Sequence, residues 1–224
     1  MAKKTKLTHQ QIAEGINTAA ANASRLAADS ELMFNLGRYP TSLALAILSI
    51  EESGKPAILR QLSVAVTDQH VKCAWGNFIK HQKKSIMISF EPMFKAGARN
   101  INDFIPMGLP VNTAPNELDT LKQKALYSDY IDNMWHLPEH AIDRDLAQKY
   151  LREAFKLLPK NRHVTEKEIE LYVTHLKQEK NIDNLEESKK SIIEFYEDMK
   201  YHGLLDEVPS YIYEFYGEKK MDLS

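Results

Sequence analysis

The sequence LALAILSI at residues 43–50 runs directly into EESGK at residues 51–55. Successive residues of an α-helix are about 100° apart, so an unbroken run of apolar and small residues covers every side of the helix. Such a helix needs neighbours all round, whereas a surface helix needs cover on one side only. We therefore expect residues 41–66 to form the central helix of a bundle. Pro56 lies inside this segment and predicts a kink or a restart near Gly54.

Helical spacing continues on both sides of the central segment. Before it, residues 8–11 form a capping-box pattern, and apolar residues recur at helical spacing up to Gly37. This pattern predicts one long amphipathic helix. After the central segment, a third helix is expected to start at residue 67 or 68 and to run to at least Lys84. SIMISF at 85–90 alternates and could form a short strand, but we expect it to continue the helix.

The rest of the chain predicts one loop and further helices. Residues 106–115 hold three prolines and one glycine, which mark a loop. The expected helices run from Asn116 to Trp135, from about 139 to 158, from 165 to 180 and from 185 to 202, followed by a Tyr-rich end after 209.

Composition agrees with a helical protein. The 224 residues include only eight glycines and nine prolines, which disfavours turn-rich β architectures. The single Cys73 cannot form an internal disulfide, and one thiol is too few for a Cys-based zinc site. We expect no metal and no cofactor. No apolar run approaches the roughly 20 residues of a membrane helix, and no apolar region follows the N-terminal lysines as in a signal peptide. We expect a cytoplasmic, all-α protein without contact to a membrane.

Charge divides the chain into two parts. Residues 1–163 hold 21 basic and 16 acidic side chains, whereas residues 164–224 hold 8 and 15. We expect a helical core over 1–163 and an acidic helical extension over 164–224, packed on or beside the core. Its apolar residues could complete the bundle, or its acidic helices could cover the basic segment 70–99, which carries six cations and one Glu.

The third predicted helix has two different faces. A histidine with several cations on an exposed face suits metal-independent RNA cleavage, which needs a base, an acid and positive charge near the phosphate. His81 with Lys80 and Lys84 could supply these groups; the alternative is a solvated lysine-rich surface. The packing face holds Val71, Trp75, Phe78, Ile79 and Ile86, and the opposite face holds His70, Asn77, His81 and Lys84.

The polar end of the central helix carries two adjacent glutamates. Glu51 and Glu52 lie about 100° apart, so at least one should point into a polar interior or an interface. Lys55, four and three residues later, is a partner for either. A stripe of Asn22, Arg25 and Asp29 on the first helix offers further partners. A structural ion-pair network and a functional role both remain open.

One motif is set aside. Residues 136–140, HLPEH, match the HxxEH zinc pattern, but both histidines would have to lie on one continuous helix. Pro138 interrupts that helix, so we do not expect zinc chemistry here.

The order of these pieces resembles the AbiV family of abortive-infection proteins, a branch of the helical HEPN superfamily. The resemblance covers roughly residues 15–155. The matching residues are Asn22 with Arg25 to Asp29, Gly37-Arg38-Tyr39, the alanine-rich entry to EESGK, WGNFIKHQKK at 75–84, LKQKALYSDY at 121–130, Trp135 and Pro138.

The resemblance implies a HEPN-like helical bundle, usually a homodimer, that arrests growth or translation of a bacterial host during phage infection. HEPN relatives are commonly metal-independent ribonucleases with an Arg, four to six intervening residues and a His. None of the seven arginines here has a His at that spacing. His81 therefore takes the catalytic role by resemblance alone, with Lys80 or Lys84 in place of the arginine.

Two functions follow as expectations. The first is an effector that cleaves RNA (tRNA, rRNA or mRNA) or blocks translation, with a site across a dimer interface and a phage-encoded protein as a possible trigger. The second is a non-catalytic HEPN module that binds a protein partner and blocks its function. For the first, the expected catalytic residues are His81, Lys80, Lys84 and Glu52, the RNA contacts are Lys55, Arg38, Lys72, Lys83 and Asn77, and the polar network is Asn22, Arg25, Asp29 and Glu51.

Overall fold

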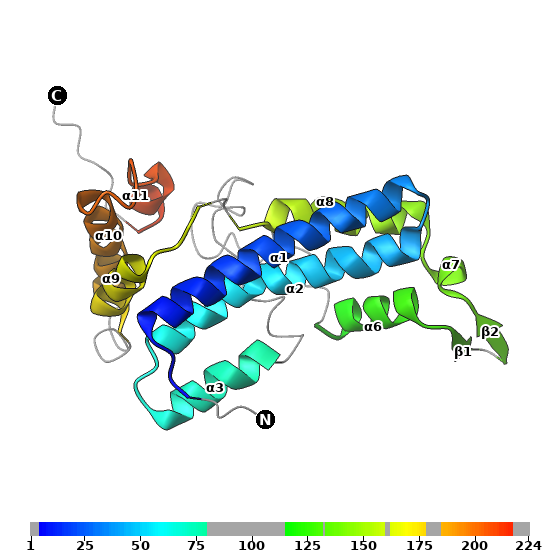
Figure 1. The fold of residues 1–224 in the computed structure, drawn as a ribbon, viewed down its shortest axis with the longest axis horizontal. Coiled ribbons are helices and arrows are strands. Elements are labelled where there is room, and N and C mark those ends of the chain that lie inside the picture. Colours follow the sequence, from blue (N-terminus) through cyan, green and yellow to red (C-terminus); the bar gives the residue numbers. More distant parts are fainter. Residues whose placement is uncertain (1–4, 80–114, 132, 160–161, 178–184, 217–224) are drawn as a thin grey trace.

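The computed structural model of the chain describes residues 5–79, 115–131, 133–159, 162–177 and 185–216 (Figure 1). Two long antiparallel helices, α1 (His9–Asn35) and α2 (Tyr39–Ser63), run through the middle of the molecule. Gly37 in the turn between them has a φ of 73°, a left-handed conformation that glycine adopts without strain. The described residues form an all-α fold apart from one small hairpin.

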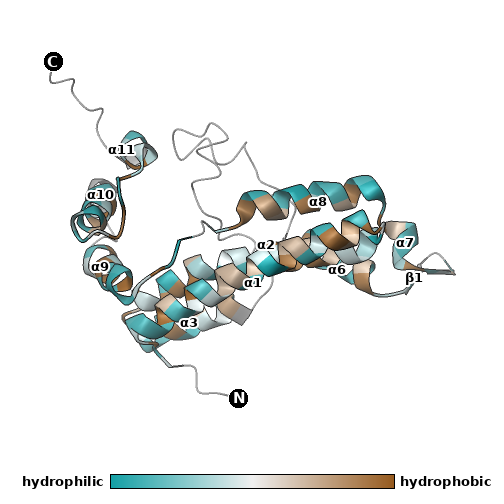
Figure 2. Cartoon of the chain, turned by 45° about the horizontal axis from the view of Figure 1, so that its top comes forward, coloured by the Kyte–Doolittle hydropathy of each residue, from teal (hydrophilic) through white to brown (hydrophobic). Residues whose placement is uncertain are grey.

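Helix α1 begins with the expected capping box. The Oγ1 of Thr8 accepts a hydrogen bond from the Gln11 backbone N–H, and the Gln11 side chain accepts one from the Thr8 N–H. Its buried residues repeat at helical spacing, and Figure 2 shows hydrophobic and hydrophilic residues alternating along the helix. The prediction of one long amphipathic helix is confirmed.

Helix α2 is the central helix that the apolar run predicts. Leu43, Ala46 and Ile47 are completely buried. The helix continues through Pro56, so of the two expected outcomes, a kink or a restart near Gly54, the restart does not occur. Proline removes one backbone hydrogen bond of the helix, and close packing around this part of α2 offsets the loss. Gly54 is buried, and α1 approaches so closely at Gly15 that a Cβ there would lie 3.1 Å from the Leu59 side chain.

Besides α1, three helices make the most extensive contacts with α2. They are α3 (Asp68–Ile79), α6 (Pro115–Leu126) and α8 (Arg144–Leu157), of which α8 also contacts α1. The Thr67 hydroxyl accepts a hydrogen bond from the His70 N–H, which confirms the predicted start of the third helix. Its expected continuation to Lys84 and through SIMISF lies outside the described residues. None of the helices in the described ranges is both long and apolar enough to cross a membrane.

A β-hairpin replaces the end of the helix expected to reach Trp135. Helix α6 ends at Leu126, and strands β1 (Asp129–Ile131) and β2 (Met134–His136) pair antiparallel with Tyr130 opposite Trp135. Asn133, in the tight turn, has a φ of 64°, which asparagine tolerates better than most residues. A short helix, α7 (Pro138–Ala141), then leads to α8, whose N-cap is Asp143.

Three helices, α9 (Glu166–Leu176), α10 (Leu185–Tyr201) and α11 (Ser210–Tyr216), form the C-terminal part at the left of Figure 1. Ile169 of α9 is completely buried in a cluster with residues of α1, α2 and α3. A separate cluster of Leu171, Phe195 and Met199 joins α9 to α10. Ile169 thus helps to complete the bundle. Whether acidic helices cover the basic segment stays a prediction, because residues 80–99 lie outside the described ranges.

Candidate functional site

The first glutamate after the apolar run of α2 is part of a buried ion pair. Glu51 is 3% exposed, and its Oε1 lies 2.7 Å from the Nζ of Lys122 on α6. Lys122 is 5% exposed and also lies 3.2 Å from Asp119. A buried carboxylate needs such a partner, so this pair fixes the position of α6 on α2. The prediction that at least one glutamate points into a polar interior is confirmed.

The second glutamate pairs within α2. Glu52 accepts a hydrogen bond from Lys55 one turn later, and the two side chains are 16% and 18% exposed. The Nζ of Lys55 also lies 5.3 Å from the ring centroid of Phe78 on α3, within the range of a cation–π contact. The pair is partly desolvated but still reached by solvent, and it lies beside the last described turn of α3.

Helix α3 holds its apolar face against the bundle. Trp75 and Phe78 pack against the buried cluster around Val71, and their rings meet edge to face at 5.5 Å. The indole N–H of Trp75 donates to the Thr5 carbonyl at 3.0 Å. This face matches the sequence prediction as far as the described residues extend.

The other face of α3 carries the polar residues of the expected site. His70 on this face is exposed, and Asn77 is half-buried. Lys72 is exposed as well, but it lies about 200° around the helix from His70, beside the packing face. Lys80, His81, Lys83 and Lys84 follow α3 in sequence and lie outside the described residues. The described part of the expected site is therefore divided. Lys55, paired with Glu52 on α2, contacts α3 at Phe78 on its packing face, and His70 and Asn77 lie on the other face.

Arg38 does not join this group. It is the exposed N-cap of α2, whereas Lys55 lies in the second half of the same helix. A helix rises about 1.5 Å per residue, so roughly 25 Å separates the two positions along α2. Arg38 is therefore too far from Glu52 and Lys55 to contact the same phosphate.

Asn22, Arg25 and Asp29 contact one another on α1, as expected, whereas Glu51, the fourth residue of the expected network, pairs with Lys122 of α6. Arg25 donates to Asp29 at 2.7 Å and to the Asn22 side chain at 2.9 Å. The Ser49 hydroxyl donates to the Ala23 carbonyl, which places the start of this stripe level with the polar end of α2. The Arg25 side chain is 61% exposed, so its ion pair contributes little to stability.

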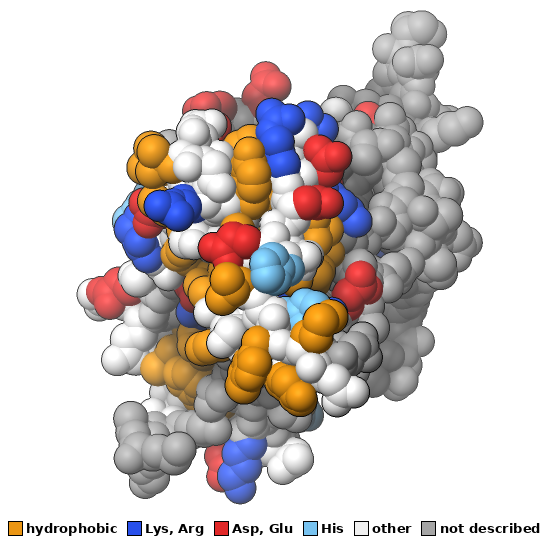
Figure 3. Space-filling model, turned by 90° about the vertical axis from the view of Figure 1, so that its right-hand side faces the viewer, with side chains coloured by type: hydrophobic (Ala, Val, Ile, Leu, Met, Phe, Trp, Pro, Cys, Tyr) orange, Lys and Arg blue, Asp and Glu red, His pale blue; other side chains and the backbone are white. Residues whose placement is uncertain are grey.

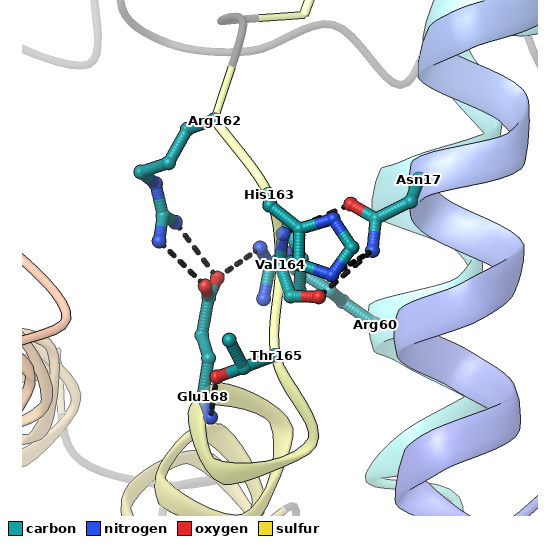
Figure 4. A network of polar contacts seen from close by, with 7 residues as sticks. All are labelled: Asn17, Arg60, Arg162, His163, Val164, Thr165 and Glu168. Carbon is teal, nitrogen blue, oxygen red and sulfur yellow. Dashed lines mark hydrogen bonds and ion pairs between the residues drawn. The ribbon is translucent and has the colours of Figure 1, made fainter.

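A second polar network joins the C-terminal part to the core (Figure 4). Glu168 of α9 is 1% exposed and accepts hydrogen bonds from Arg60 of α2 at 2.6 Å and from both terminal nitrogens of Arg162. Beside it, the Asn17 side chain of α1 bonds both the N–H and the carbonyl of Val164. One carboxylate and one amide thus tie the start of α9 to both long helices.

Aromatic rings surround the arginine of this network. The Arg60 guanidinium lies 5.3 Å from the ring centroid of Tyr172. Burial raises the pKa of Tyr172 and of Tyr196 above the usual tyrosine value, and the positive charge of Arg60 offsets part of this rise. Both hydroxyls are therefore neutral at physiological pH. Sequence reasoning missed this network, because no local pattern relates Arg60 to a residue 108 positions away.

An open groove of about 450 Å³ lies between α1 and α8, away from Glu52 and Lys55. None of the expected site residues lines it. Its lining consists of Glu31, Phe34, Asn35, Gln148, Leu151, Arg152, Phe155 and Lys156.

The two histidines of the HLPEH segment lie on different elements. His136 ends β2 and His140 lies in α7, with ring centroids 6.2 Å apart. The Nδ1 of His140 accepts a hydrogen bond from the Leu137 N–H at the start of α7. The prediction that Pro138 keeps the two histidines off one continuous helix is confirmed. No three His, Cys, Asp or Glu side chains gather as a metal site within the described part of the chain.

Comparison with known proteins gives one match. The family model HEPN_AbiV, described as AbiV, matches residues 11–159. The match spans α1 to α8, including Glu52, Lys55, the described part of α3 and the hairpin. No curated protein and no solved structure matches the chain.

Proposed function

This chain belongs to the AbiV family of abortive-infection proteins, within the HEPN superfamily, and from that membership we propose that it arrests translation or growth of a bacterial cell during phage infection. The proposed activity is metal-independent cleavage of cellular RNA: tRNA, rRNA or mRNA. The activity takes place in the cytoplasm, and a phage-encoded protein triggers it.

The proposed reaction uses the 2′-hydroxyl of the RNA as nucleophile. A base removes its proton, the oxygen attacks the adjacent phosphorus, and the 5′-oxygen leaves with a proton from an acid. The products are a 2′,3′-cyclic phosphate and a 5′-hydroxyl. His81 and Glu52 are the proposed acid–base residues. Lys80 or Lys84 takes the place of the arginine of HEPN ribonucleases and, with Lys55, stabilises the negative charge on phosphorus.

One observation carries the proposal. Lys55 contacts Phe78, which lies two residues before Lys80 and three before His81. The last described turn of α3 thus ends beside a partly desolvated cation. Electrostatic stabilisation of phosphate is stronger at such a position than in bulk water. Lys72 and Asn77 on α3, with Lys83 after it, are the proposed further RNA contacts.

The second candidate is a non-catalytic HEPN module that binds a protein partner and blocks its function. The absence of an Arg and His at the family spacing favours it. The neutralisation of Lys55 by Glu52 favours it as well, because a phosphate would have to compete with that carboxylate.

We further propose that the chain acts as a homodimer and has two parts. The boundary between a helical core and an acidic extension is proposed at residues 163 and 164. Contacts of α9 with α1 and α2 support an extension that is packed on the core.

Growth of cells that express His81→Ala tests the proposed function. We expect the unaltered protein to arrest growth and the variant to lose this effect, because acid–base catalysis typically contributes about 10² to 10⁴-fold in rate. The readouts are colony counts after induction and incorporation of labelled amino acids.

The matched control is His70→Ala, which removes an exposed histidine of α3. It should arrest growth as the unaltered protein does, and both variants should melt at about the same temperature. Full growth arrest by His81→Ala would remove His81 from the mechanism and leave the non-catalytic function.

A further inference from the structure

The hairpin exposes large apolar side chains at one end of the molecule. Trp135 is 74% exposed, and Tyr130, whose ring centroid lies 5.3 Å from that of Trp135, is 55% exposed. Tyr127, Met134 and Leu137 are also more than half exposed. Figure 3 looks at this end and shows hydrophobic side chains gathered there beside histidines. Contiguous exposed apolar side chains commonly mark an interaction site.

The hairpin also has an outer edge, that of β2, which no other strand of the described residues covers. Within the described residues, β1 and β2 form a sheet of two strands only, each of three residues. An isolated two-stranded hairpin is marginally stable in water and gains from a further strand. The Tyr130 N–H on the outer edge of β1 already donates to the Asp129 side chain at 2.8 Å. The outer edge of β2, at Trp135, therefore offers the backbone donor and acceptor to an extended polypeptide.

Charge determines which kind of partner fits. Residues 124–144 hold four carboxylates against two cations, the exposed Lys124 and Arg144 at either end, and so carry a net negative charge. Asp129 at the start of β1 and Glu139 in α7 are exposed. This surface attracts cations and repels the phosphates of RNA and of anionic lipids, even though its aromatic rings could stack on bases. A second copy of the chain would bring four more carboxylates against it.

The pairing of β1 with β2 determines which side chains of a bound segment meet which face of the hairpin. Tyr130 and Trp135 face each other on one side of the hairpin, whereas Asp129 and His136 lie on the opposite side together with the exposed Met134. A strand added at the outer edge of β2 also alternates its side chains between the two faces. Apolar residues of the added strand would cover Tyr130 and Trp135 on one face, and its basic residues would lie beside Asp129 on the other face.

We infer that the hairpin is a docking surface for an extended polypeptide segment in which Lys or Arg alternates with apolar residues. The segment pairs with the outer edge of β2, packs its apolar side chains on Tyr130 and Trp135, and places its cations beside Asp129 and Glu139. This inference goes beyond the proposed RNA cleavage and does not depend on it.

The probe is a synthetic peptide of about eight residues in which Lys and Val alternate, long enough to span a typical strand. It is titrated into the full chain while tryptophan fluorescence is recorded. Binding should shift the emission to shorter wavelength and protect Trp135 from acrylamide, and both changes should be absent in Trp135→Phe. Trp135→Ala lacks this reporter, so its binding is measured by titration calorimetry, and it should be at least about tenfold weaker than that of the unaltered chain, as expected for an aromatic anchor. Added salt should weaken binding as well.

Matched variants test the contribution of the carboxylates separately from that of the aromatic side chains. Asp129→Asn with Glu139→Gln should weaken binding and reduce its salt dependence. Tyr201→Ala removes an aromatic side chain that is 85% exposed in α10, and should change nothing. A Glu and Val peptide of the same length should not bind.

Four results would overturn the inference. The first two are that the Lys and Val peptide does not bind, or that the Glu and Val peptide binds equally well. The other two are that Trp135→Ala binds the peptide as tightly as the unaltered chain, or that a single-stranded RNA oligonucleotide protects Trp135 in place of the peptide. Light scattering tests whether a second copy of the chain occupies the hairpin instead. A mass that halves in Trp135→Ala would mean that a second copy occupies the hairpin, which would also contradict the inference.

Discussion

Glu51→Ala is expected to destabilise the fold by about 3 to 5 kcal/mol, because removal of one partner leaves an uncompensated buried charge on the other. Lys122 is 5% exposed, and among the described residues its other charged partner is Asp119, 3.2 Å away, whose side chain is 43% exposed. The loss is measured as the shift of the urea unfolding midpoint by circular dichroism. A loss below about 1 kcal/mol would contradict a structural role for this pair.

Two control variants distinguish a buried charge from general damage to α2. Glu52→Ala should cost less, about 1 to 2 kcal/mol, because Glu52 and Lys55 are each still reached by solvent. Glu51→Leu combined with Lys122→Met should recover much of the lost stability, since apolar residues of similar size often replace a buried ion pair without loss.

Glu168→Ala is expected to cost about 3 to 5 kcal/mol and to act locally. Glu168 is 1% exposed and neutralises Arg60 and Arg162 together. Arg60 would suffer most, because its Nη1 is already buried without a hydrogen-bond partner. We expect faster amide hydrogen exchange in α9 to α11, with α1 and α2 still protected.

The matched control for this prediction is Glu166→Ala. Glu166 lies in the same first turn of α9 but is exposed. Its loss removes only a favourable charge at a helix N-terminus, worth about 0.3 to 1 kcal/mol. Equal hydrogen exchange in the two variants would show that the Arg60 and Arg162 contacts do not hold α9 on the core.

The local features of the fold were predictable from the sequence, because their causes lie within a few residues. The capping pattern at residues 8–11 predicts the start of α1, and the apolar run before Glu51 predicts the central helix. The sequence also predicts that one of two adjacent glutamates is buried. It does not reveal that the partner is Lys122, because the two residues are 71 positions apart and meet only when α6 docks on α2.

The hairpin and the Arg60 network show where sequence reasoning fails. Asp132 and Asn133 between aromatic and branched residues are a turn pattern, which the helical spacing from Asn116 onward obscured. Glu168 looks like one more solvated carboxylate of an acidic helix. Its burial depends on Arg60, 108 residues earlier, which no periodicity connects to it. The four predicted site residues after Ile79 lie outside the described residues and stay predictions.

Incubation of the purified chain with total RNA in the presence of EDTA tests the proposed ribonuclease most directly. We expect cleavage without added metal, with 2′,3′-cyclic phosphate and 5′-hydroxyl ends, and no cleavage by His81→Ala. Intact RNA after incubation with a folded protein that arrests growth in cells would contradict the proposal. Equal cleavage by His81→Ala would contradict it as well.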